Sequence, residues 1–527
     1  MNNPQRLGPR DWTEQSNRIR QLLLREDFIG ATGMLQEWAA SPCEPEVLSR
    51  VQNDLGVLAT LRGDRTAATG AFDLACILAP GWPVPRQNLA RLNAFRGTTA
   101  TAPSDGQGTR ATRIAIVSLL FNWPSTGGGT VHTAELARFL SRAGYDVQHW
   151  VLRQVGWSVG ELSKAPDWPI RILDFTAAEW RCELIQQRVR AAADEFAPDH
   201  VIITDSWSFK PRLAEALRGR SYFLRLAAQE CLCPLSNVRL LDDGRGGWRS
   251  CPLHQLATPD SCRRCVKERA HLSGQLHRAE RALAGFDQPD YDASLRRAFA
   301  EASGILVVNP LIAESVKPYA SATHVIPSGF DVERFRTTKD PRSAVDGCRR
   351  ILFAGLVEEP MKGFAVLHEA CRMLWEHRRD FRLLATADPV GTRDPFTDYV
   401  GWHAQADLPS LMGDCDLVVC PTVAEEALGR AAVEAMGTGR PVVASRIGGL
   451  PFTVSEDATG LLCHPGDALD LLRQLNRLLD DDELRRRLGM AGRRRFLDVY
   501  AWEAILPHYV RLFGPASRVS PPVLTGA

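Results

Sequence analysis

The residues with the clearest potential for chemistry are two carboxylates, Glu426 and Glu434, with seven residues between them. Residues 416–420 form an apolar run typical of a buried parallel strand, and residues 426–436 carry apolar side chains at helical spacing. Both carboxylates are then expected at the carboxyl ends of the strands, where open α/β sheets bind ligands and a carboxylate accepts hydrogen bonds from hydroxyl groups. Alternatively, the pair marks only a solvated helix face.

Two glycine loops have a pattern that suits an anion. Gly128 and Gly129 follow an apolar run at residues 113–120 and precede a helical pattern, so backbone N–H groups at a helix N-terminus would face the anion. Gly448 and Gly449 form a second loop of this kind after another apolar run. A glycine loop alone is weak evidence, and the two loops gain weight only from their context.

A cysteine-rich insert at residues 231–265 interrupts the pattern around it. A C-x2-C pair is half of a tetrahedral zinc site, because two intervening residues let both thiolates reach one ion. Zinc would fix a loop that has too few apolar residues to pack by itself. Free thiols, a disulfide or an iron–sulfur centre are the alternatives, and Cys231 or His254 is a substitute for one ligand. The four predicted zinc ligands are Cys233, Cys251, Cys262 and Cys265.

Length, net charge and cysteine content limit the class of protein in which these motifs occur. A chain of 527 residues is long enough for two or more domains, and a formal net charge of +1 gives no reason to expect a nucleic-acid partner. The first residues lack the apolar core of a signal peptide, and no run of about 18 apolar residues predicts a transmembrane segment. Thirteen cysteines without an export signal predict reduced thiols and a cytoplasmic location.

Residues 11–95 are predicted to form an all-α module, joined by a small, polar linker at residues 96–111. The pattern of small and large side chains resembles a tetratricopeptide repeat, with a degenerate copy at residues 14–40 and a partial one at residues 84–95. Such repeats bind a protein partner through a groove, and a generic helical hairpin is the alternative. The residues that carry the pattern are Leu55, Gly56, Ala68, Phe72, Ala75 and Pro80.

Several motifs together resemble family 4 of the retaining glycosyltransferases, which have the GT-B fold. They are E-x-x-G-x-x-x-x-E running into EAM-x-x-G-x-PVV, P-x-x-GGG-x-x-H-x-x-x-LA, and HVIPSGFDVERF, spread over most of residues 112–510. The resemblance implies an α/β body of two Rossmann-like lobes after the helical module. The acceptor lobe would span residues 112–322, the nucleotide-sugar lobe residues 323–497, and a helix at residues 498–514 would return to the first lobe.

The same resemblance implies metal-independent transfer of a hexose, with retention, from a UDP- or GDP-sugar. The acceptor would be a glycan, a lipid-linked molecule or a protein in glycan or polysaccharide biosynthesis. Glu426 would hold the sugar, Glu434 the ribose, and Lys362 with Gly363 and the glycine loops the diphosphate. The D-x-D at residues 414–416 opens a strand and so lies away from the ligand crevice. Two arginine triplets near residue 490 make the inner face of a membrane an alternative location.

The chain also departs from the family pattern. Leu356 stands where the family has an arginine, Phe452 where it has a glutamate, and Gln229-Glu230 where many members have His-Asp. These departures favour a second hypothesis, a catalytically inactive scaffold that binds partners through its helices, whereas a GT-B epimerase or phosphorylase fits the motifs less well. His132 and Asp205 are further candidates for substrate contact, and their alternatives are an ordinary helix residue and a helix cap.

Overall fold

The computed structural model divides into two compact units, one with the N-terminal helices and one from Arg110 to Ser517. Most of the predicted linker and of the degenerate repeat copy lie outside the described residues. Among the described residues, no helix combines the length and the apolar character needed to cross a membrane. The structure describes Ile19 and residues 34–39, 44–61, 65–79, 81–94, 110–125, 127–242, 248–335, 347–388 and 394–516.

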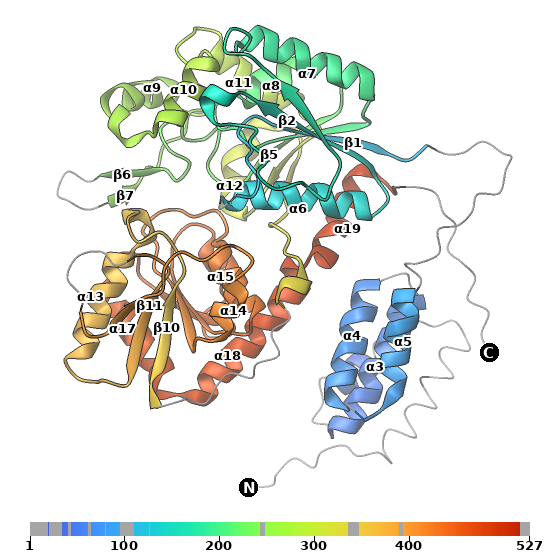
Figure 1. The fold of residues 1–527 in the computed structure, drawn as a ribbon, viewed down its shortest axis with the longest axis vertical. Coiled ribbons are helices and arrows are strands. Elements are labelled where there is room, and N and C mark those ends of the chain that lie inside the picture. Colours follow the sequence, from blue (N-terminus) through green and yellow to red (C-terminus); the bar gives the residue numbers. More distant parts are fainter. Residues whose placement is uncertain are drawn as a thin grey trace, which may run out of the picture. The chain divides into compact units, whose positions relative to one another are not determined.

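The first unit contains the helices α3 (Pro45–Leu61), α4 (Arg65–Leu78) and α5 (Pro83–Ala94) (Figure 1). A Cβ on Gly56 would lie 2.6 Å from the ring of Phe72, so a small residue lets α3 and α4 pack closely. The Ser49 hydroxyl donates to the Ala75 carbonyl at 2.8 Å, and together with the Gly56–Phe72 contact this shows that the two helices run in opposite directions. The predicted helices are present here, while their identity as a repeat stays a prediction.

The first lobe of the second unit is built on a parallel sheet in the order β3-β2-β1-β4-β5-β8-β9 (Figure 1). Its apolar strands are buried on both faces, as in parallel sheets covered by helices. The strands are β1 (Arg113–Ser118), β2 (Asp146–Arg153), β3 (Ile170–Asp174), β4 (His200–Thr204), β5 (Tyr222–Leu226), β8 (Gly304–Val307) and β9 (Thr323–Val325). The covering helices include α6 (Gly128–Arg142), α7 (Cys182–Phe196), α8 (Lys210–Ala216), α11 (Tyr291–Glu301) and α12 (Pro310–Val316).

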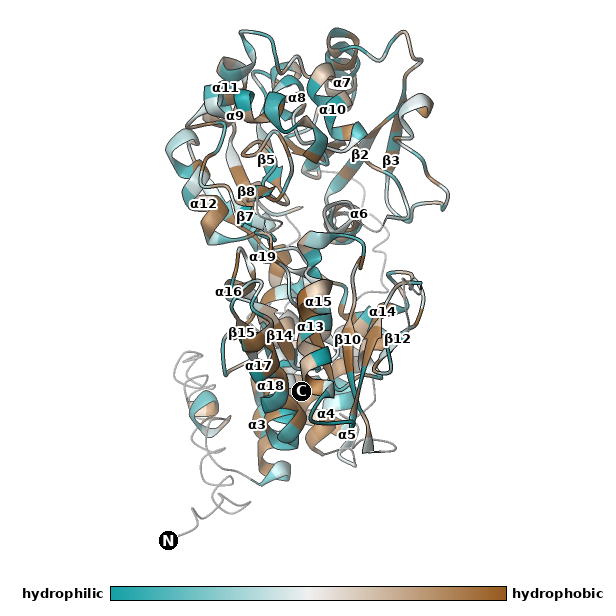
Figure 2. Cartoon of the chain, turned by 90° about the vertical axis from the view of Figure 1, so that its left-hand side faces the viewer, coloured by the Kyte–Doolittle hydropathy of each residue, from teal (hydrophilic) through white to brown (hydrophobic). Residues whose placement is uncertain are grey.

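The second lobe repeats this architecture with a parallel sheet in the order β12-β11-β10-β13-β14-β15. Figure 2 shows hydrophobic strands such as β10, β14 and β15 inside this lobe, with more polar helices around them. The strands are β10 (Arg349–Phe353), β11 (Phe381–Ala385), β12 (Thr397–Tyr399), β13 (Leu417–Cys420), β14 (Val442–Ser445) and β15 (Gly460–Cys463). The helices include α13 (Phe364–Trp375), α14 (Leu408–Gly413), α15 (Arg430–Gly437), α16 (Leu450–Thr453), α17 (Ala468–Asp480) and α18 (Asp482–Arg495).

Two chain crossings connect the lobes and pair with each other. The Phe330 N–H donates to the Tyr500 carbonyl at 2.8 Å, and the Trp502 N–H donates to the Phe330 carbonyl at 3.2 Å. A Cβ on Gly329 would overlap the Trp502 indole, so the crossing needs a glycine there. After this crossing, α19 (Trp502–Phe513) packs into the hydrophobic core of the first lobe.

The cysteine-rich insert contains a two-stranded antiparallel ribbon followed by short helices. Its elements are β6 (Leu240–Asp242), β7 (Trp248–Ser250), α9 (Pro259–Glu268) and α10 (Gln275–Leu283). The insert belongs to the first lobe, because the Arg296 guanidinium of α11 donates to the Leu256 carbonyl at 2.9 Å. The ribbon extends toward the second lobe (Figure 1), where Arg239, beside β6, lies 3.7 Å from Glu425.

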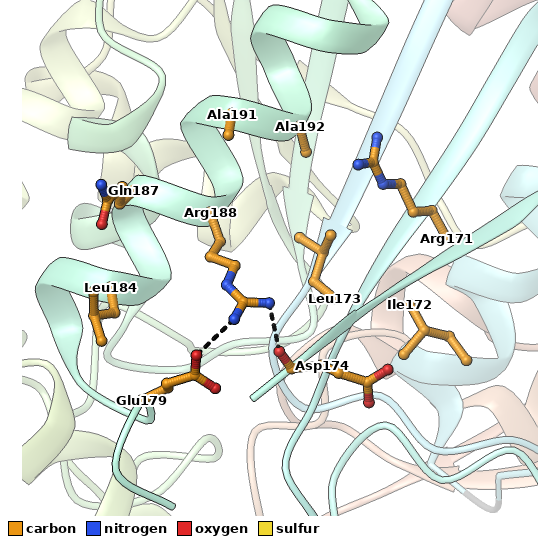
Figure 3. A pocket seen from close by; sticks show the side chains of 10 residues that line it. All are labelled: Arg171, Ile172, Leu173, Asp174, Glu179, Leu184, Gln187, Arg188, Ala191 and Ala192. Carbon is orange, nitrogen blue, oxygen red and sulfur yellow. Dashed lines mark hydrogen bonds and ion pairs between the residues drawn. The ribbon is translucent and has the colours of Figure 1, made fainter. Parts of the chain in front are cut away.

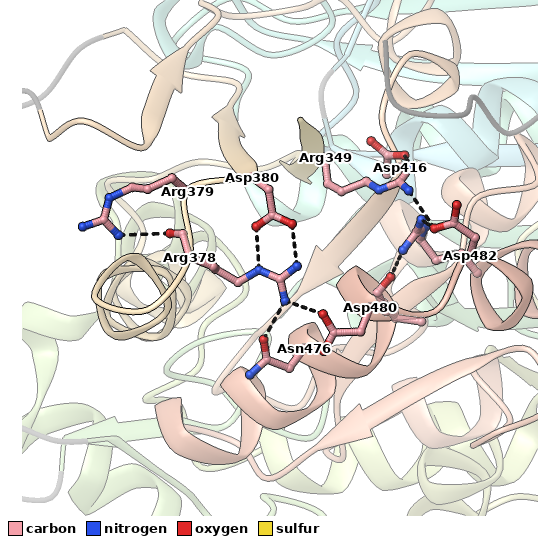
Figure 4. A network of polar contacts seen from close by, with 10 residues as sticks. Arg349, Arg378, Arg379, Asp380, Asp416, Asn476, Asp480 and Asp482 are labelled. Atoms are coloured by element: carbon pink, nitrogen blue, oxygen red, sulfur yellow. Dashed lines mark hydrogen bonds and ion pairs between the residues drawn. The ribbon is translucent and has the colours of Figure 1, made fainter. Parts of the chain in front are cut away.

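A network of ion pairs lies where the strands of the second sheet begin (Figure 4). Arg349 opens β10 and contacts Asp416 at 3.3 Å and Asp482 at 2.7 Å, while Arg378 holds Asp380 and Asp480 at 2.7 Å each. Asp416, the second acid of the D-x-D sequence, is therefore a structural ion-pair partner at the edge opposite to the carboxyl ends of the strands.

Candidate active site

Strand order reverses at one place in each sheet, and ligands bind beside such switch points at the carboxyl ends of the strands. In the first lobe the reversal lies between β1 and β4, and in the second lobe between β10 and β13. The loops after β1 and β4 carry the first glycine loop and Asp205. The loops after β10 and β13 carry Lys362 and Glu426.

Lys362 and Glu426 form an ion pair at the switch point of the second lobe. Lys362 Nζ donates to Glu426 Oε1 at 2.8 Å, and the two side chains are 32% and 20% exposed. The Glu426 charge raises the pKa of Lys362, so the ammonium is charged at neutral pH. The sequence placed these two residues in one site although 64 positions separate them.

The loop before α13 can approach the loop after β13 only because residue 363 is a glycine. Gly363 has a φ of +74°, and an added Cβ would overlap the carbonyl oxygen of Pro421. Two hydrogen bonds join the loops, because the Thr422 hydroxyl and the Val423 N–H both donate to the Met361 carbonyl, at 2.7 and 2.9 Å. These contacts fix Lys362 beside Glu426.

Gly448 and Gly449 support Glu426 from the other side. With φ +58°, Gly448 lies so close that a Cβ would be 2.6 Å from the Glu426 carbonyl oxygen, and a Cβ on Gly449 would overlap Ala427. The Gly449 N–H donates to the Glu426 carbonyl at 2.7 Å. Gly449 therefore holds the Glu426 loop, and the phosphate contact expected from this glycine loop stays a prediction.

Glu434 lies inside α15 and is nearly covered, with 3% of its surface exposed. Its Oε1 accepts a hydrogen bond from Gln405 Nε2 at 2.5 Å, and burial raises the pKa of its carboxyl. Arg334 donates to the Gln405 carbonyl at 2.7 Å and to Glu135 of the first lobe at 3.1 Å. Gln405 therefore occupies one oxygen of the Glu434 carboxylate, and Arg334 links the Gln405 backbone to the first lobe.

On the facing lobe, the glycine loop lies against the second lobe. The Val131 N–H makes the first hydrogen bond of α6, to the Gly127 carbonyl, so the amides of Gly128 and Gly129 precede the helical ladder. A Cβ on Gly128 would overlap the side chain of Arg430, the first residue of α15. The first glycine loop and the N-terminus of α15 therefore meet at the boundary between the lobes.

His132 and Asp205 have different surroundings. His132 is fully buried, stacks on Trp502 with ring centroids 5.2 Å apart, and accepts the Gly329 N–H at Nδ1. Burial lowers its pKa well below the ordinary value, so it is a neutral residue of the interlobe crossing. Asp205 has a φ of +42° and accepts hydrogen bonds from Ser118 at 3.0 Å and Thr130 at 3.2 Å.

Sequence reasoning missed the contacts that join the Glu426 loop to the first lobe. Glu425 accepts from Gln229 Nε2 at 3.3 Å, and Asn309 Nδ2 donates to the Ala427 carbonyl at 2.6 Å. Gln229 stands where the family pattern has histidine, and here it reaches the residue next to Glu426. The signal available in the sequence was the doublet of glutamates, without any indication of its partners.

The four cysteines predicted as zinc ligands all line one cavity of about 340 Å³ in the insert. They are free thiols, and burial raises the pKa of Cys262 to about 12. Within the described part of the chain, no group of three or more His, Cys, Asp or Glu side chains has an arrangement that could hold a metal ion. The zinc prediction therefore has the expected residues around one space but not the geometry of a metal site.

A larger pocket of about 540 Å³ lies between β3 and α7, far along the sheet from the switch point (Figure 3). Arg188 crosses it, donating to Glu179 and to the Asp174 carbonyl at 2.7 and 2.9 Å. Arg171 pairs with Glu195, and Asp174 pairs with Arg153. Because its charged side chains already have partners and none of the predicted site residues lines it, we do not assign the chemistry to this pocket.

Comparison with known proteins gives sequence relatives for the body. Residues 348–481 match the sequence profile of the family described as Glycosyl transferases group 1. The MMP alpha-(1->4)-mannosyltransferase of Mycolicibacterium hassiacum is 31% identical over 204 residues, which cover 37% of this chain and 48% of that protein. The D-inositol 3-phosphate glycosyltransferase of Corynebacterium kroppenstedtii is 29% identical over 231 residues, covering 38% and 50%. The chain spans about half the length of these two relatives.

Solved structures match a larger part of the chain. Sucrose-phosphate synthase from Thermosynechococcus elongatus aligns with a TM-score of 0.51 and 20% identity, covering 76% of this chain and 98% of that one. The Anabaena protein HepE in complex with UDP aligns with a TM-score of 0.52 and 16% identity, covering 76% and 98%. At such low sequence identities, these structural alignments show a shared fold alone. The second lobe thus has the sequence signature of the group 1 glycosyl transferases, on a two-lobed GT-B body shared with these structures.

Proposed function

We propose that this protein is a retaining glycosyltransferase that moves a hexose from a UDP- or GDP-sugar to an acceptor in glycan biosynthesis. The observation that carries the proposal is the Lys362–Glu426 ion pair at the switch point of the second lobe. The matched profile covers Lys362, Glu426 and Glu434, and a neighbour in fold was solved with UDP, which supports a nucleotide donor.

The transfer requires a positive partner for the leaving diphosphate and a hold on the sugar while positive charge develops at its anomeric carbon. Lys362 would supply the first, because its ammonium is charged and a third of its side chain is exposed. Glu426 would supply the second by accepting hydrogen bonds from sugar hydroxyls. The two side chains neutralise each other in their ion pair, and a bound donor would give each of them a new partner.

Glu434 would bind the ribose hydroxyls in place of the Gln405 amide, which donates to one of its carboxylate oxygens. Only the side chain of Gln405 would have to turn away, because Arg334 holds its backbone carbonyl. The acceptor would enter from the first lobe, where Asp205 lies at the switch point.

Transfer and hydrolysis assays on the purified full chain test this proposal. A panel of UDP- and GDP-sugars is incubated with the protein, and release of the nucleoside diphosphate is measured. Release from one donor supports the enzyme. Tight binding of a donor without any release, with or without candidate acceptors, would favour the inactive scaffold. Changing Lys362 or Glu426 to alanine is expected to lower release roughly tenfold or more.

We propose zinc for the four cysteines of the insert on narrower grounds, namely their spacing and their shared cavity. The ion would have a structural role, holding the insert from which Arg239 reaches Glu425 at 3.7 Å. The protein partner of the N-terminal helices also stays a prediction.

A further inference from the structure

Arg430 occupies an unusual position for a charged side chain. It is the first residue of α15 and belongs to the second lobe, yet its aliphatic part lies against Gly128 of the first lobe, where a Cβ would overlap Arg430 Cδ. Its guanidinium lies over the ring of Phe330, with Cζ 4.2 Å from the ring centroid. The side chain is only 14% exposed. Arg430 is thus enclosed between the two lobes and the crossing that joins them.

The guanidinium has no hydrogen-bond partner for either terminal nitrogen among the described residues, and both nitrogens are buried. The closest carboxylate with a measured contact is Glu434, whose Oε1 is 3.6 Å from Nη2, beyond hydrogen-bond distance. Buried donors without partners cost free energy, and folded proteins usually satisfy them. The two buried nitrogens of Arg430 therefore mark a place where acceptor atoms of a ligand would satisfy the guanidinium.

The surroundings specify an anion. Among the described residues, the amides of Gly128 and Gly129 have no hydrogen-bond acceptor; they stand at the N-terminus of the 15-residue helix α6, which favours negative charge, and the Arg430 stem touches this loop. A guanidinium binds phosphate oxygens through paired N–H donors, which gives both affinity and orientation. The boundary between the lobes therefore combines a helix N-terminus with a buried positive charge.

We propose that Arg430 binds the diphosphate of the nucleotide donor from the side of the first lobe, opposite to Lys362. This inference rests on the proposed function and adds a residue to it. Arg430 would contact phosphate oxygens together with the Gly128 and Gly129 amides, so the diphosphate would connect the two lobes. The competing explanation is that Arg430 only compensates the charge of Glu434.

Calorimetric titration of the full chain distinguishes these roles. The probes are UDP and GDP, the nucleosides uridine and guanosine, and inorganic phosphate added after saturation with the nucleoside diphosphate. Arg430→Met keeps the aliphatic packing against Gly128 and removes the charge, while Arg430→Lys keeps a charge without the fork of donors. Arg349→Gln is the matched control, because it removes a guanidinium from the same lobe at the opposite edge of the sheet.

We expect Arg430→Met to weaken binding of the nucleoside diphosphate roughly tenfold or more, Arg430→Lys less, and both to change nucleoside binding less than about twofold. The control is expected to bind like the wild type. Equal losses for the nucleoside and the diphosphate would overturn the inference in favour of compensation of Glu434. So would failure of both Arg430 variants to fold, or a loss confined to inorganic phosphate, which would assign the residue to a phosphorylated acceptor. If the wild type bound no nucleotide, the proposed function itself would fail.

Discussion

Replacing Lys362 with methionine separates a catalytic role from a structural one. The ion pair with Glu426 is short but partly exposed, so water and salt screen it, and pairs of this kind contribute about 1 kcal/mol or less to stability. A hydrogen bond from a charged group to a phosphate contributes roughly 1.5–3 kcal/mol, and each 1.36 kcal/mol is tenfold in rate. Lys362→Met is therefore expected to lower kcat/KM roughly 10- to 150-fold, with a change of about 1 kcal/mol or less in the free energy of unfolding.

A double-mutant cycle gives the sharper result. The Lys362→Met, Glu426→Gln and double variants are assayed for donor turnover and for unfolding in urea. If the pair is only structural, the double variant recovers most of the loss, because neither charge is left alone. If the two residues contact different parts of the donor, the double variant is at least as slow as the slower single variant. Arg477→Met, which breaks an exposed pair with Asp457 in the same lobe, is the control. Recovery of turnover in the double variant would refute the assigned roles.

Three further outcomes are expected. Gly363→Ala should lower both stability and turnover, because a φ of +74° strains the new residue and its Cβ overlaps Pro421. A crystal structure of the variant with an unchanged loop, or an unchanged melting temperature, would contradict this. Acid should destabilise the protein through His149, whose pKa burial lowers from 6.5 to about 3. Below pH 6.5 the unfolded state binds a proton that the folded state does not, so the free energy of unfolding falls, by about 2 kcal/mol at pH 5. In urea titrations, His149→Gln should therefore reduce the dependence of the free energy of unfolding on pH. Elemental analysis should find about one zinc ion per chain. Less than about 0.2 zinc ion per chain would exclude a metal in the insert.

Strands β1 and β13 could be predicted because they lie in the apolar runs at residues 113–120 and 416–420. Strand β5, next to β4 in the first sheet, has a weaker pattern. Arg225 interrupts its apolar run, and the hydrogen-bond partner of this arginine, Ser328, is 103 positions away. The edge strand β9 has only three residues, which carry too little pattern to identify. Glu426 lies before helix α15 and Glu434 inside it, as expected from the sequence, although the apolar pattern of residues 426–436 becomes helical only from Arg430, after Gly429 with a φ of +74°.

The candidate site divides in the same way. Lys362 and Glu426 could be placed together because motif spacing and the rule for switch points both indicate them. The contacts of Arg430 with Gly128 and of Glu425 with Gln229 join different lobes, and no local pattern encodes them. In the cysteine insert, the spacing correctly brings the four cysteines around one cavity. Within the described residues, however, they do not have the geometry of a metal site.

Binding of a nucleotide sugar beside Lys362 can be measured directly by thermal unfolding. The full chain is melted with a panel of UDP- and GDP-sugars, beside the Lys362→Met variant under identical conditions. We expect one nucleotide class to raise the melting temperature of the wild type in proportion to the logarithm of its concentration, and this rise to be largely lost in the variant. A folded wild-type protein that no nucleotide sugar stabilises, or a variant stabilised as strongly as the wild type, would contradict it.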